Sequence, residues 1–329
     1  MTASTLVVVN PASAAGRTRR EWPAIRTCLL EAGVEFDHRM SSAQGDCAIL
    51  AREGLREGYE RIVAVGGDGT LNEVVNGFFD TDGSPIRAAA MLGMIPSGTG
   101  GDFRRSAGIP REPHAAAALL ARGDVRPIDV GRIDYAEEPA GGVHHFVNIA
   151  DCGLGGEVAA RANASSKRFG GTATFYWASM RAIAVFGRRR CRIEVDGVPF
   201  EGRVQNVVVA NGSWFGGGMW VAPDARLDDG LLDVVVIGDA SRLRTVLESR
   251  RIYKGTHVGR PEVLVMRGRE VRVTPRDTVP FRFDVDGEAI GRAPATLRVL
   301  PGAVRLCAAN HETRSAVDLD REPKDDGRI

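Results

Sequence analysis

Three features that the sequence lacks each exclude a class of protein. The five cysteines are odd in number, widely spaced and without a Cys-x-x-Cys pair, so neither a disulfide framework nor a zinc site is expected, and the chain suits a reducing compartment. No apolar stretch reaches about 18 residues, the length that spans a membrane. Residues 1–10 contain no basic region ahead of an apolar core, so we expect no signal peptide and a cytoplasmic location, with peripheral contact at a membrane left open.

Neither sign of charge is in excess. The chain has 43 lysines and arginines against 42 aspartates and glutamates, a formal net charge of +1. A nucleic-acid-binding protein usually carries a clear basic excess. We therefore expect no nucleic-acid partner.

Apolar runs in the first third of the chain predict an α/β domain. The 329 residues, 43% of them apolar and 26% charged, should form a soluble protein of two domains. Strands are expected at residues 6–9, 34–38, 62–65 and 89–95, and helices at residues 22–32, 46–57 and directly after residue 70. Strands that alternate with helices predict a doubly wound α/β nucleotide-binding domain over residues 1–124.

From about Val125 the pattern changes to short alternating runs separated by turns. Strands are expected at residues 143–150, 191–195, 204–210, 232–237, 270–274, 281–285 and 303–308. This spacing, with Asp196-Gly197 and Asp286-Gly287 as hairpin turns, predicts an antiparallel β-sandwich over residues 125–310. An apolar helix is expected at residues 172–186, and a charged, mobile tail at residues 311–329.

The most informative stretch is Gly66-Gly67-Asp68-Gly69-Thr70, called here the glycine-rich turn, which follows an apolar run. Three glycines in four positions let the backbone turn sharply and approach a ligand closely. A helix is expected to follow, with Thr70 and Glu73 at the spacing of a capping box, and backbone N–H groups at such a helix start form an anion site. The turn is therefore predicted to bind phosphate. The alternative is a connection with an ordinary helix cap and no ligand; the spacing fits neither a Walker A loop nor a Rossmann motif.

Polar residues follow several of the predicted strands. Asn10, Ser42, the glycine-rich turn and the Ser97-Gly98-Thr99 stretch each lie just after a strand end. In doubly wound sheets, ligands bind beyond the carboxyl ends of the strands. We therefore expect these residues to converge at one edge of the sheet.

With these motifs in place, the sequence resembles the diacylglycerol kinase catalytic-domain family, which includes bacterial lipid kinases and sphingosine kinases. The resemblance covers residues 6–308 and rests on the glycine-rich turn followed by Leu-Asn-Glu-Val-Val-Asn-Gly, and on the loop Pro-Ser-Gly-Thr-Gly-Gly-Asp-Phe at residues 96–103. It also rests on the C-terminal stretches at residues 221–225, 228–233 and 285–288. The glycine-rich turn alone also occurs in NAD kinases.

The resemblance implies an ATP site at the strand ends. The segment from Asn10 to Arg17 resembles the part that holds the nucleotide, and Ser42 stands where the family often has a threonine that touches ATP. The residues expected to contact ATP are Asn10, Ser42, Gly66, Gly67, Asp68, Gly69, Thr70, Leu71, Asn72, Glu73, Ser97, Gly98 and Thr99.

The resemblance also implies a metal site and a general base in the second domain. Asp229, with the backbone oxygens of Arg226 and Leu231, resembles a bound-magnesium site that is structural in related enzymes. The Asp286-Gly287-Glu288 segment resembles the one that carries the base, and the sequence leaves open whether Glu288 or Asp286 has that role. By themselves, Asp228-Asp229-Gly230 and Asp286-Gly287 are also ordinary turn sequences.

Two positions depart from the family pattern. In the loop of residues 96–103, called here the second loop, Gly101 replaces the asparagine that is usual in the family, which should loosen that turn. Asp151-Cys152 stands where the family often has small or apolar residues. If the segment around Asp151-Cys152 contacts the lipid that accepts the phosphate, that lipid is expected to differ from plain diacylglycerol.

These observations predict an ATP-dependent, magnesium-requiring lipid kinase. It would phosphorylate a hydroxyl of diacylglycerol or a related lipid at the membrane surface, in phospholipid biosynthesis, with a homodimer possible through an apolar face of the second domain. An alternative is an NAD kinase, which Asn72-Glu73 directly after the turn disfavours. Another is a non-catalytic lipid-binding module with a decayed nucleotide site; Gly101 favours it, whereas Asp68, Asp229 and Glu288 argue against it.

Overall fold

The computed structural model describes residues 4–98, 101–136, 142–153, 156, 188–238, 251–278 and 281–309. The helix expected at residues 172–186, the tail from residue 311 and Thr99 of the second loop lie outside these ranges. In the described part of the chain, no helix is long and apolar enough to cross a membrane.

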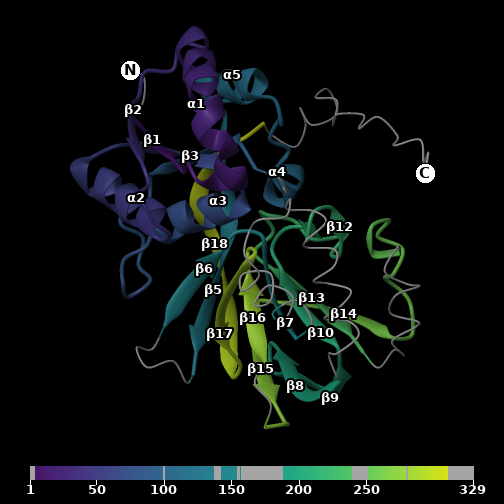
Figure 1. Cartoon of the computed structure of the whole chain (residues 1–329). Coiled ribbons are helices and arrows are strands. Elements are labelled where there is room, and N and C mark those ends of the chain that lie inside the picture. Colours follow the sequence, from purple (N-terminus) through teal and green to yellow (C-terminus); the bar gives the residue numbers. More distant parts are fainter. Residues whose placement is uncertain are drawn as a thin grey trace, which may run out of the picture.

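The N-terminal part alternates strands and helices (Figure 1). Its strands pair in parallel in the order β2-β1-β3-β4 and are β1 (Thr5–Val9), β2 (Asp37–Met40), β3 (Arg61–Gly66) and β4 (Met91–Pro96). Its helices are α1 (Ser13–Glu31), α2 (Asp46–Glu57), α3 (Asp68–Asn76), α4 (Asp102–Ala107) and α5 (Pro113–Arg122). The first turn of α1 is not regular helix, since Ala14, Ala15 and Gly16 have positive φ angles.

Helices cover both faces of this parallel sheet. On one face, Val7 and Val9 of β1 share a core with α1 and α5. On the other face, Leu6 and Val8 share a core with α2 and α3. Alternate residues of one strand thus face opposite helix layers, which is why β1 and β3 read as continuous apolar runs. The doubly wound α/β part is confirmed.

The C-terminal part is mainly antiparallel, and its strands are all short except two. They are β5 (Val125–Tyr135), β6 (Val143–Phe146), β7 (Ile149–Gly153), β8 (Arg189–Val195), β9 (Val198–Val204), β10 (Asn206–Ala210), β11 (Trp214–Phe215), β12 (Met219–Trp220), β13 (Leu232–Ile237), β14 (Val263–Gly268), β15 (Glu270–Pro275), β16 (Arg282–Val285), β17 (Glu288–Arg292) and β18 (Ala295–Cys307). Among the described strands, β14-β13-β10-β7-β16-β17 form one sheet. Apolar side chains of that sheet pack against β5, β8, β15 and β18 in a shared core. The antiparallel sandwich is confirmed.

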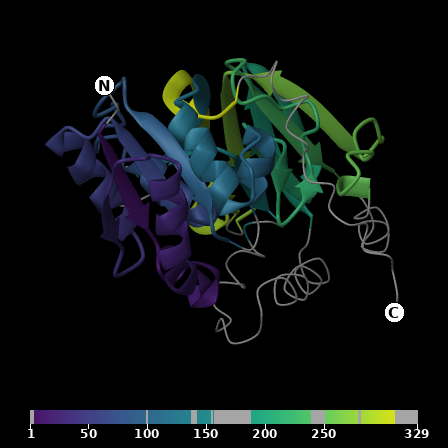
Figure 2. The same cartoon turned by 90° about the horizontal axis from the view of Figure 1, so that it is seen from above.

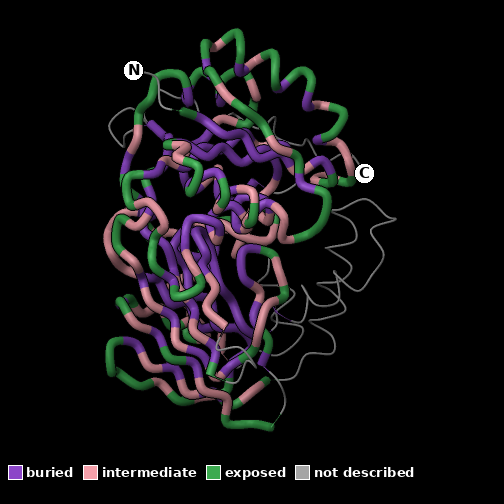
Figure 3. Tube along the Cα trace, turned by 90° about the vertical axis from the view of Figure 1, so that its left-hand side faces the viewer, coloured by how far each residue is buried: buried purple, intermediate pink, exposed green. Residues whose placement is uncertain are grey.

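Strand β18 connects the two parts of the molecule. Its C-terminal end pairs in parallel with β4, and its length pairs antiparallel with β5 across a bulge. The parallel sheet and the strands β15, β8 and β9 are therefore one continuous sheet. Seen from above, the helical part and the second sheet lie side by side (Figure 2), and buried segments run through the strands of both parts (Figure 3). The division at residues 124 and 125 stays a prediction.

Both predicted hairpin turns are confirmed. Asp196-Gly197 joins β8 to β9, and Asp286-Gly287 joins β16 to β17. The φ angles are 46° and 84° in the first turn and 50° and 92° in the second. Two successive positive φ angles match the twist of antiparallel strands, and Asp-Gly tolerates them.

The strand expected at residues 143–150 is divided into β6 and β7. The break falls at Val147 and Asn148, whose backbone N–H groups donate to the carboxylate of Asp286. At this break the Asp286 carboxylate, and not a neighbouring strand, accepts the backbone hydrogen bonds. The apolar pattern of the sequence does not indicate this long-range contact. The break belongs to the candidate site.

Candidate functional site

The glycine-rich turn is packed closely against the loop after β4. A Cβ on Gly98 would lie 2.6 Å from Cα of Gly67, and a Cβ on Gly66 would lie 2.4 Å from Oγ1 of Thr70. Only glycine fits such contacts, because the first is made to backbone. The glycines therefore bring two strand ends together.

Hydrogen bonds join the ends of β1, β3 and β4. The Asn10 amide donates to Oγ1 of Thr70 over 3.0 Å, and the Ser13 hydroxyl donates to the carbonyl of Ser97 over 2.9 Å. Arg17 donates to the carbonyl of Gly98. The predicted convergence of Asn10, the glycine-rich turn and the Ser97–Gly98 stretch at one edge is thus present.

The predicted capping box is wrong. Helix α3 begins at Asp68, its N-cap is Gly67, and no side chain caps it. Thr70 lies inside the first turn as the acceptor for Asn10, and a Glu73 carboxylate oxygen accepts the N–H of Cys47 on α2. The helix starts earlier than predicted because the glycines let the backbone turn before Asp68.

Ser42 lies in the connection between β2 and α2. Its N–H and its hydroxyl both donate to the Asp46 carboxylate. Ser42 is exposed. Contact of Ser42 with a nucleotide stays a prediction.

Two carboxylates lie beside the turn, that of the half-buried Asp68 and that of the buried Asp102. Asp68 accepts the N–H groups of Asp102 and Phe103 at the start of α4, over 3.0 and 3.3 Å. Asp102 accepts from Gly217 and pairs with Arg105. Burial raises the pKa of both carboxyls, and the charge of Asp68 raises that of Asp102 further. Asp102 is not among the site residues predicted from the sequence, although its place directly after the glycines of a strand-end loop was a signal.

Gly101 has a clear local role. Its φ is +70°, in the left-handed region, and it forms the N-cap of α4. A Cβ at this position would lie 2.9 Å from Nε of Arg104. Glycine at this position therefore adopts the left-handed backbone conformation without strain and leaves room for the side chain of Arg104.

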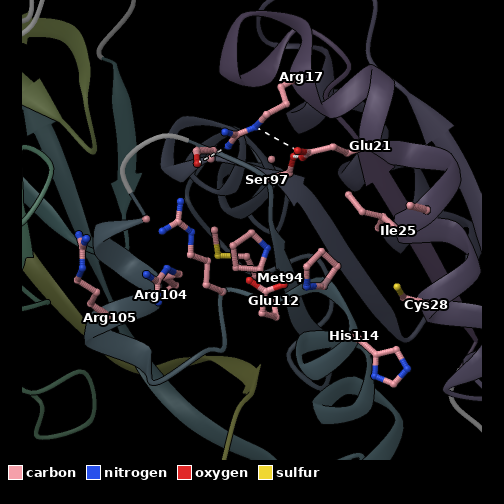
Figure 4. A pocket seen from close by; sticks show the side chains of 18 residues that line it. Arg17, Glu21, Ile25, Cys28, Met94, Ser97, Arg104, Arg105, Glu112 and His114 are labelled. Carbon is pink, nitrogen blue, oxygen red and sulfur yellow. Dashed lines mark hydrogen bonds and ion pairs between the residues drawn. The ribbon is translucent and has the colours of Figure 1, made fainter. Parts of the chain in front are cut away.

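A cavity of about 420 Å³ opens next to the glycine-rich turn, on the side of α1 and α5. Arg17 and Glu21 of α1 lie on one wall, and Arg104 and Arg105 of α4 lie on the other (Figure 4). Gly66, Gly67, Ser97 and Gly98 form part of the lining. The lining thus combines arginines with the carboxylates of Glu21 and Glu112. Sequence reasoning missed the two arginines on α4.

The Asp286 carboxylate is fully occupied by hydrogen bonds. One oxygen accepts the N–H groups of Asn148 and Ile149, and the other accepts the N–H of Val147 and the amide of Asn72, over 2.8 to 3.1 Å. Burial raises its pKa to about 6, although these donors lower it. Asp286 thus ties α3, which follows the glycine-rich turn, to the break between β6 and β7.

Glu288 lies two residues further on, against the glycine-rich turn. A Cβ built on Gly69 would lie 3.5 Å from Oε1 of Glu288. Residues about 220 positions apart are therefore neighbours, and a carboxylate from the C-terminal hairpin reaches the N-terminal glycine-rich turn. Of the two acids left open by the sequence, Asp286 has both oxygens committed to protein donors, four in all.

A second acidic pair lies on the neighbouring strands. Asp151 of β7 and Asp284 of β16 are direct partners across the ladder. Asp151 is 1% exposed; one of its oxygens accepts the Asn206 amide over 3.3 Å, and the other has no partner. Burial raises the pKa of Asp151 to about 7, and burial together with the charge of Asp151 raises that of Asp284 well above its ordinary value.

We expect the Asp151–Asp284 pair to make the protein less stable as the pH rises. An acid whose folded pKa exceeds its unfolded pKa stabilises the fold below the unfolded value and loses that contribution as the pH passes the folded value. The free energy of unfolding should therefore fall between pH 3.8 and about pH 7. Asp151→Asn should flatten this decline in urea titrations at several pH values, whereas the exposed Asp277→Asn should not. An unchanged slope in Asp151→Asn would contradict the expectation.

Among the predicted magnesium ligands, the carboxylate of Asp229 is already paired with an arginine, Arg267. One Asp229 oxygen accepts the N–H of Leu231, and the other pairs with Arg267. Arg267 also pairs with the buried Asp233, over 3.2 Å. Among the described residues, no group of three or more acidic, histidine or cysteine side chains could hold a metal. Arg267 thus already supplies a positive charge to Asp229, and binding of magnesium by Asp229 with the backbone oxygens of Arg226 and Leu231 stays a prediction.

We expect chelation to leave the loop of residues 226–231 intact. Without nucleotide, the Tm should be the same in EDTA and in magnesium, because Arg267 supplies the charge that Asp229 needs. Arg267→Met should lower the Tm, since it leaves Asp233 buried without its cation. Differential scanning calorimetry measures both, with the exposed Arg276→Met as the matched control. A loss of Tm in EDTA alone would show that a metal holds the loop.

Two protein-family models match the chain. The "Diacylglycerol kinase catalytic domain" matches residues 4–133, and the "YegS C-terminal NAD kinase beta sandwich-like domain" matches residues 148–308. Among curated proteins, a diacylglycerol kinase of Bacillus subtilis (strain 168) is 29% identical over 289 residues, covering 88% of this chain and 90% of the relative. One of Staphylococcus carnosus (strain TM300) is 28% identical with the same coverage.

Solved structures show the same fold. A putative diacylglycerol kinase from Bacillus anthracis str. Sterne superposes with a TM-score of 0.74 at 24% identity, covering 93% of this chain and 97% of that one. Yeast NADH kinase complexed with NADH superposes with a TM-score of 0.55 at 12% identity, covering 100% and 90%. The second likeness extends to the fold alone.

Proposed function

Because this chain belongs to the diacylglycerol kinase catalytic-domain family and is a kinase by that membership, we propose that it transfers the γ-phosphate of ATP to a hydroxyl of diacylglycerol or a related lipid. The observation that carries the proposal is the closeness of Glu288 to the glycine-rich turn, where a Cβ on Gly69 would lie 3.5 Å from Oε1 of Glu288. A kinase needs an acceptor-side base next to its phosphate site. Here the two come from opposite ends of the chain and meet.

The proposed division of labour follows from the needs of phosphoryl transfer. That reaction requires in-line positioning, charge neutralisation and a base near the acceptor hydroxyl, and no protein nucleophile. Backbone N–H groups of the glycine-rich turn would hold phosphates, and Arg17 and Arg104 would supply positive charge from the cavity walls. Magnesium bound with ATP would neutralise further phosphate charge.

The proposed base is Glu288, and Asp286 positions it. All four donors around Asp286 are protein groups, so no acceptor site is left on it for a substrate proton. Glu288 is two residues further along the same hairpin, and its carboxylate lies near Gly69 of the glycine-rich turn. It would accept the proton of the lipid hydroxyl as the phosphate leaves ATP.

The lipid acceptor implies work at a membrane surface by peripheral contact, in phospholipid biosynthesis. A homodimer through an apolar face of the sandwich is compatible with this proposal. The NAD kinase alternative has in its favour the fold likeness and the glycine-rich turn, which also occurs in NAD kinases. Asn72, which follows the glycine-rich turn, is bonded to Asp286 and to the carbonyl of His145.

A label-transfer assay tests the proposal. Purified protein is incubated with γ-labelled ATP and magnesium, with separate pools of phosphatidylcholine vesicles containing diacylglycerol, vesicles without it, and NAD. We expect label in extracted lipid only when the lipid alcohol is present. Label in NAD would establish the alternative activity and overturn the proposal, and absence of label in every acceptor would favour a non-catalytic lipid-binding module.

A further inference from the structure

The side chain of Asn72 on α3 has two ends that face different partners. Its nitrogen, Nδ2, donates to the Asp286 carboxylate and to the carbonyl of His145, each over 2.9 Å. Its oxygen, Oδ1, lies 3.0 Å from Nε2 of His144. Asn72 is 1% exposed, so these protein groups take the place of water around it. The direction of this amide decides whether Asp286 faces a hydrogen-bond donor or a second acceptor.

Asn76, one turn further along α3, holds strand β6 beside the helix. Among the described strands, β6 pairs only with β5. At its other edge the Asn76 side chain accepts the N–H of His145 and donates to its carbonyl, each over 2.9 Å. The ring of His145 also stacks on Phe79, with 3.9 Å between the ring centroids. One amide thus pairs with both backbone groups of His145, as a neighbouring strand would, and His144 is held at a fixed place beside α3.

His144 supplies the donor for the oxygen of Asn72. Its Nε2 lies nearer to this oxygen, over 3.0 Å, than to Nδ2 of Asn76, over 3.3 Å. The two hydrogens of Asn76 Nδ2 have closer acceptors, the carbonyls of Asn72 and His145, each at 2.9 Å. The Asn72 oxygen can only accept, so Nε2 carries the ring hydrogen. Burial lowers the pKa of His144 to about 4, so at neutral pH the ring is uncharged and this is its one N–H.

Asp286 connects this arrangement to the proposed base. Three of its four donors are backbone N–H groups of residues 147–149, which come directly after β6, and the fourth is Asn72. The residue before it, Val285, is the ladder partner of Glu288. A shift of the Asp286 carboxylate would therefore move the turn that leads to Glu288. A misplacement of about 1 Å at a reacting group can cost about 100-fold in rate.

We infer that His144 is a positioning residue for phosphoryl transfer: it holds the Asn72 amide toward Asp286 and so keeps Glu288 in place beside the glycine-rich turn. The inference rests on the proposed lipid-kinase function and adds a residue to its machinery. His144 acts through two successive hydrogen bonds, and its N–H is committed to Asn72. It therefore orients the site without exchanging a proton with the substrate.

Two substitutions at His144 separate the hydrogen bond from the bulk of the ring. His144→Phe keeps a ring and removes the N–H, whereas His144→Gln places an amide N–H near the position of Nε2. Full-length protein is assayed with γ-labelled ATP, magnesium and phosphatidylcholine vesicles that contain diacylglycerol. We expect His144→Phe to lower kcat by about 10- to 100-fold with KM for ATP close to the wild-type value, and His144→Gln to restore kcat.

A second buried histidine provides the matched control. His257 is 3% exposed, and its Nε2 donates to the carbonyl of Val221 in the sandwich part. His257→Phe should lower the Tm, as His144→Phe should, because each removes a hydrogen bond from a protein acceptor. Only His144→Phe should lower kcat when both are assayed well below their Tm. Loss of stability alone would affect the two variants alike.

A measurement on the wild-type protein keeps the test independent of how the variants fold. Long-range ¹H–¹⁵N NMR of histidine-labelled protein reports which ring nitrogen carries the hydrogen, and we expect Nε2 for His144. A hydrogen on Nδ1 would overturn the positioning role. So would an unchanged kcat in His144→Phe, an equal loss in His144→Phe and His144→Gln, or a raised KM for ATP with unchanged kcat. In each of these cases transfer of label by the wild-type protein would still support a lipid kinase, whereas no label in lipid with wild-type protein would overturn the proposed function and the positioning role with it.

Discussion

Glu288→Gln is expected to reduce kcat for lipid phosphorylation by about 10²- to 10⁴-fold and to leave ATP binding intact. The amide keeps the size of the side chain but cannot accept the hydroxyl proton, and a positioned general base contributes a factor of this size. Affinity for ATP should change little, because in the proposed site the backbone of the glycine-rich turn and the arginines beside it, and not Glu288, would hold the phosphates. Steady-state transfer rates and equilibrium dialysis with ATP measure the two effects separately.

A matched control is available on the same half of the molecule. Glu201→Gln removes the same charge from β9, where Glu201 pairs with Arg276 at the surface, and should keep full activity. If Glu288→Gln retains wild-type kcat, the base assignment is wrong. If it loses ATP affinity in proportion to activity, Glu288 acts on the nucleotide side instead.

Asp286→Ala is expected to lower the free energy of unfolding by about 3–5 kcal/mol and to abolish activity with it. The change leaves the backbone N–H groups of Val147, Asn148 and Ile149 and the amide of Asn72 without their acceptor inside the protein. Each unsatisfied buried donor costs about 1–3 kcal/mol, and relaxation of the turn recovers part of the sum. Urea unfolding followed by tryptophan fluorescence measures the loss.

The chain offers a close control for this substitution. Asp196 occupies the same position in the other Asp-Gly turn, with a φ of 46° against 50°. It accepts the N–H groups of Arg269 and Glu270, but at the surface, where water can replace it. Asp196→Ala should therefore cost about 1 kcal/mol. Equal losses in the two variants would show that backbone strain, and not the buried hydrogen bonds, explains the role of Asp286.

The fold was largely readable from local patterns. The apolar runs of β1, β3 and β4 and the helix of residues 46–57 follow from burial on both faces and from helical periodicity. The Asp-Gly turns follow from backbone conformation alone. Such features depend on residues close in sequence, which is why the sequence predicts them.

Features built from distant residues were not readable in this way. The pairing of β18 with β4 joins strands some two hundred residues apart, and nothing local marks it. The capping box failed because Thr70 bonds to Asn10 and Glu73 bonds to Cys47, both on other elements. The choice between Asp286 and Glu288 likewise depended on the backbone of residues 147–149, which only the folded chain brings to Asp286.

The arginines of the cavity and the Asp151–Asp284 pair also depend on residues that are distant in sequence, so the sequence alone did not predict them in full. Arg104 and Arg105 belong to no recognisable sequence motif. Their place in the proposed site is evident only in the folded chain, where they line the same cavity as Arg17. Asp151 stood out as a departure from the family pattern, yet its partner Asp284 is 133 positions away and lies in the same ladder row. Sequence reasoning found the first of each set, and the fold supplied the second.

The central claim is that phosphate passes directly from ATP at the glycine-rich turn to a lipid hydroxyl beside Glu288. Its most direct test is a single turnover: protein in excess over γ-labelled ATP is mixed with vesicles containing the lipid alcohol, quenched over time and extracted. We expect label lost from ATP to appear at the same rate as a lipid phosphomonoester, with wild-type protein and not with Glu288→Gln. Label that appears as inorganic phosphate or in NAD, or equally in both proteins, would contradict it.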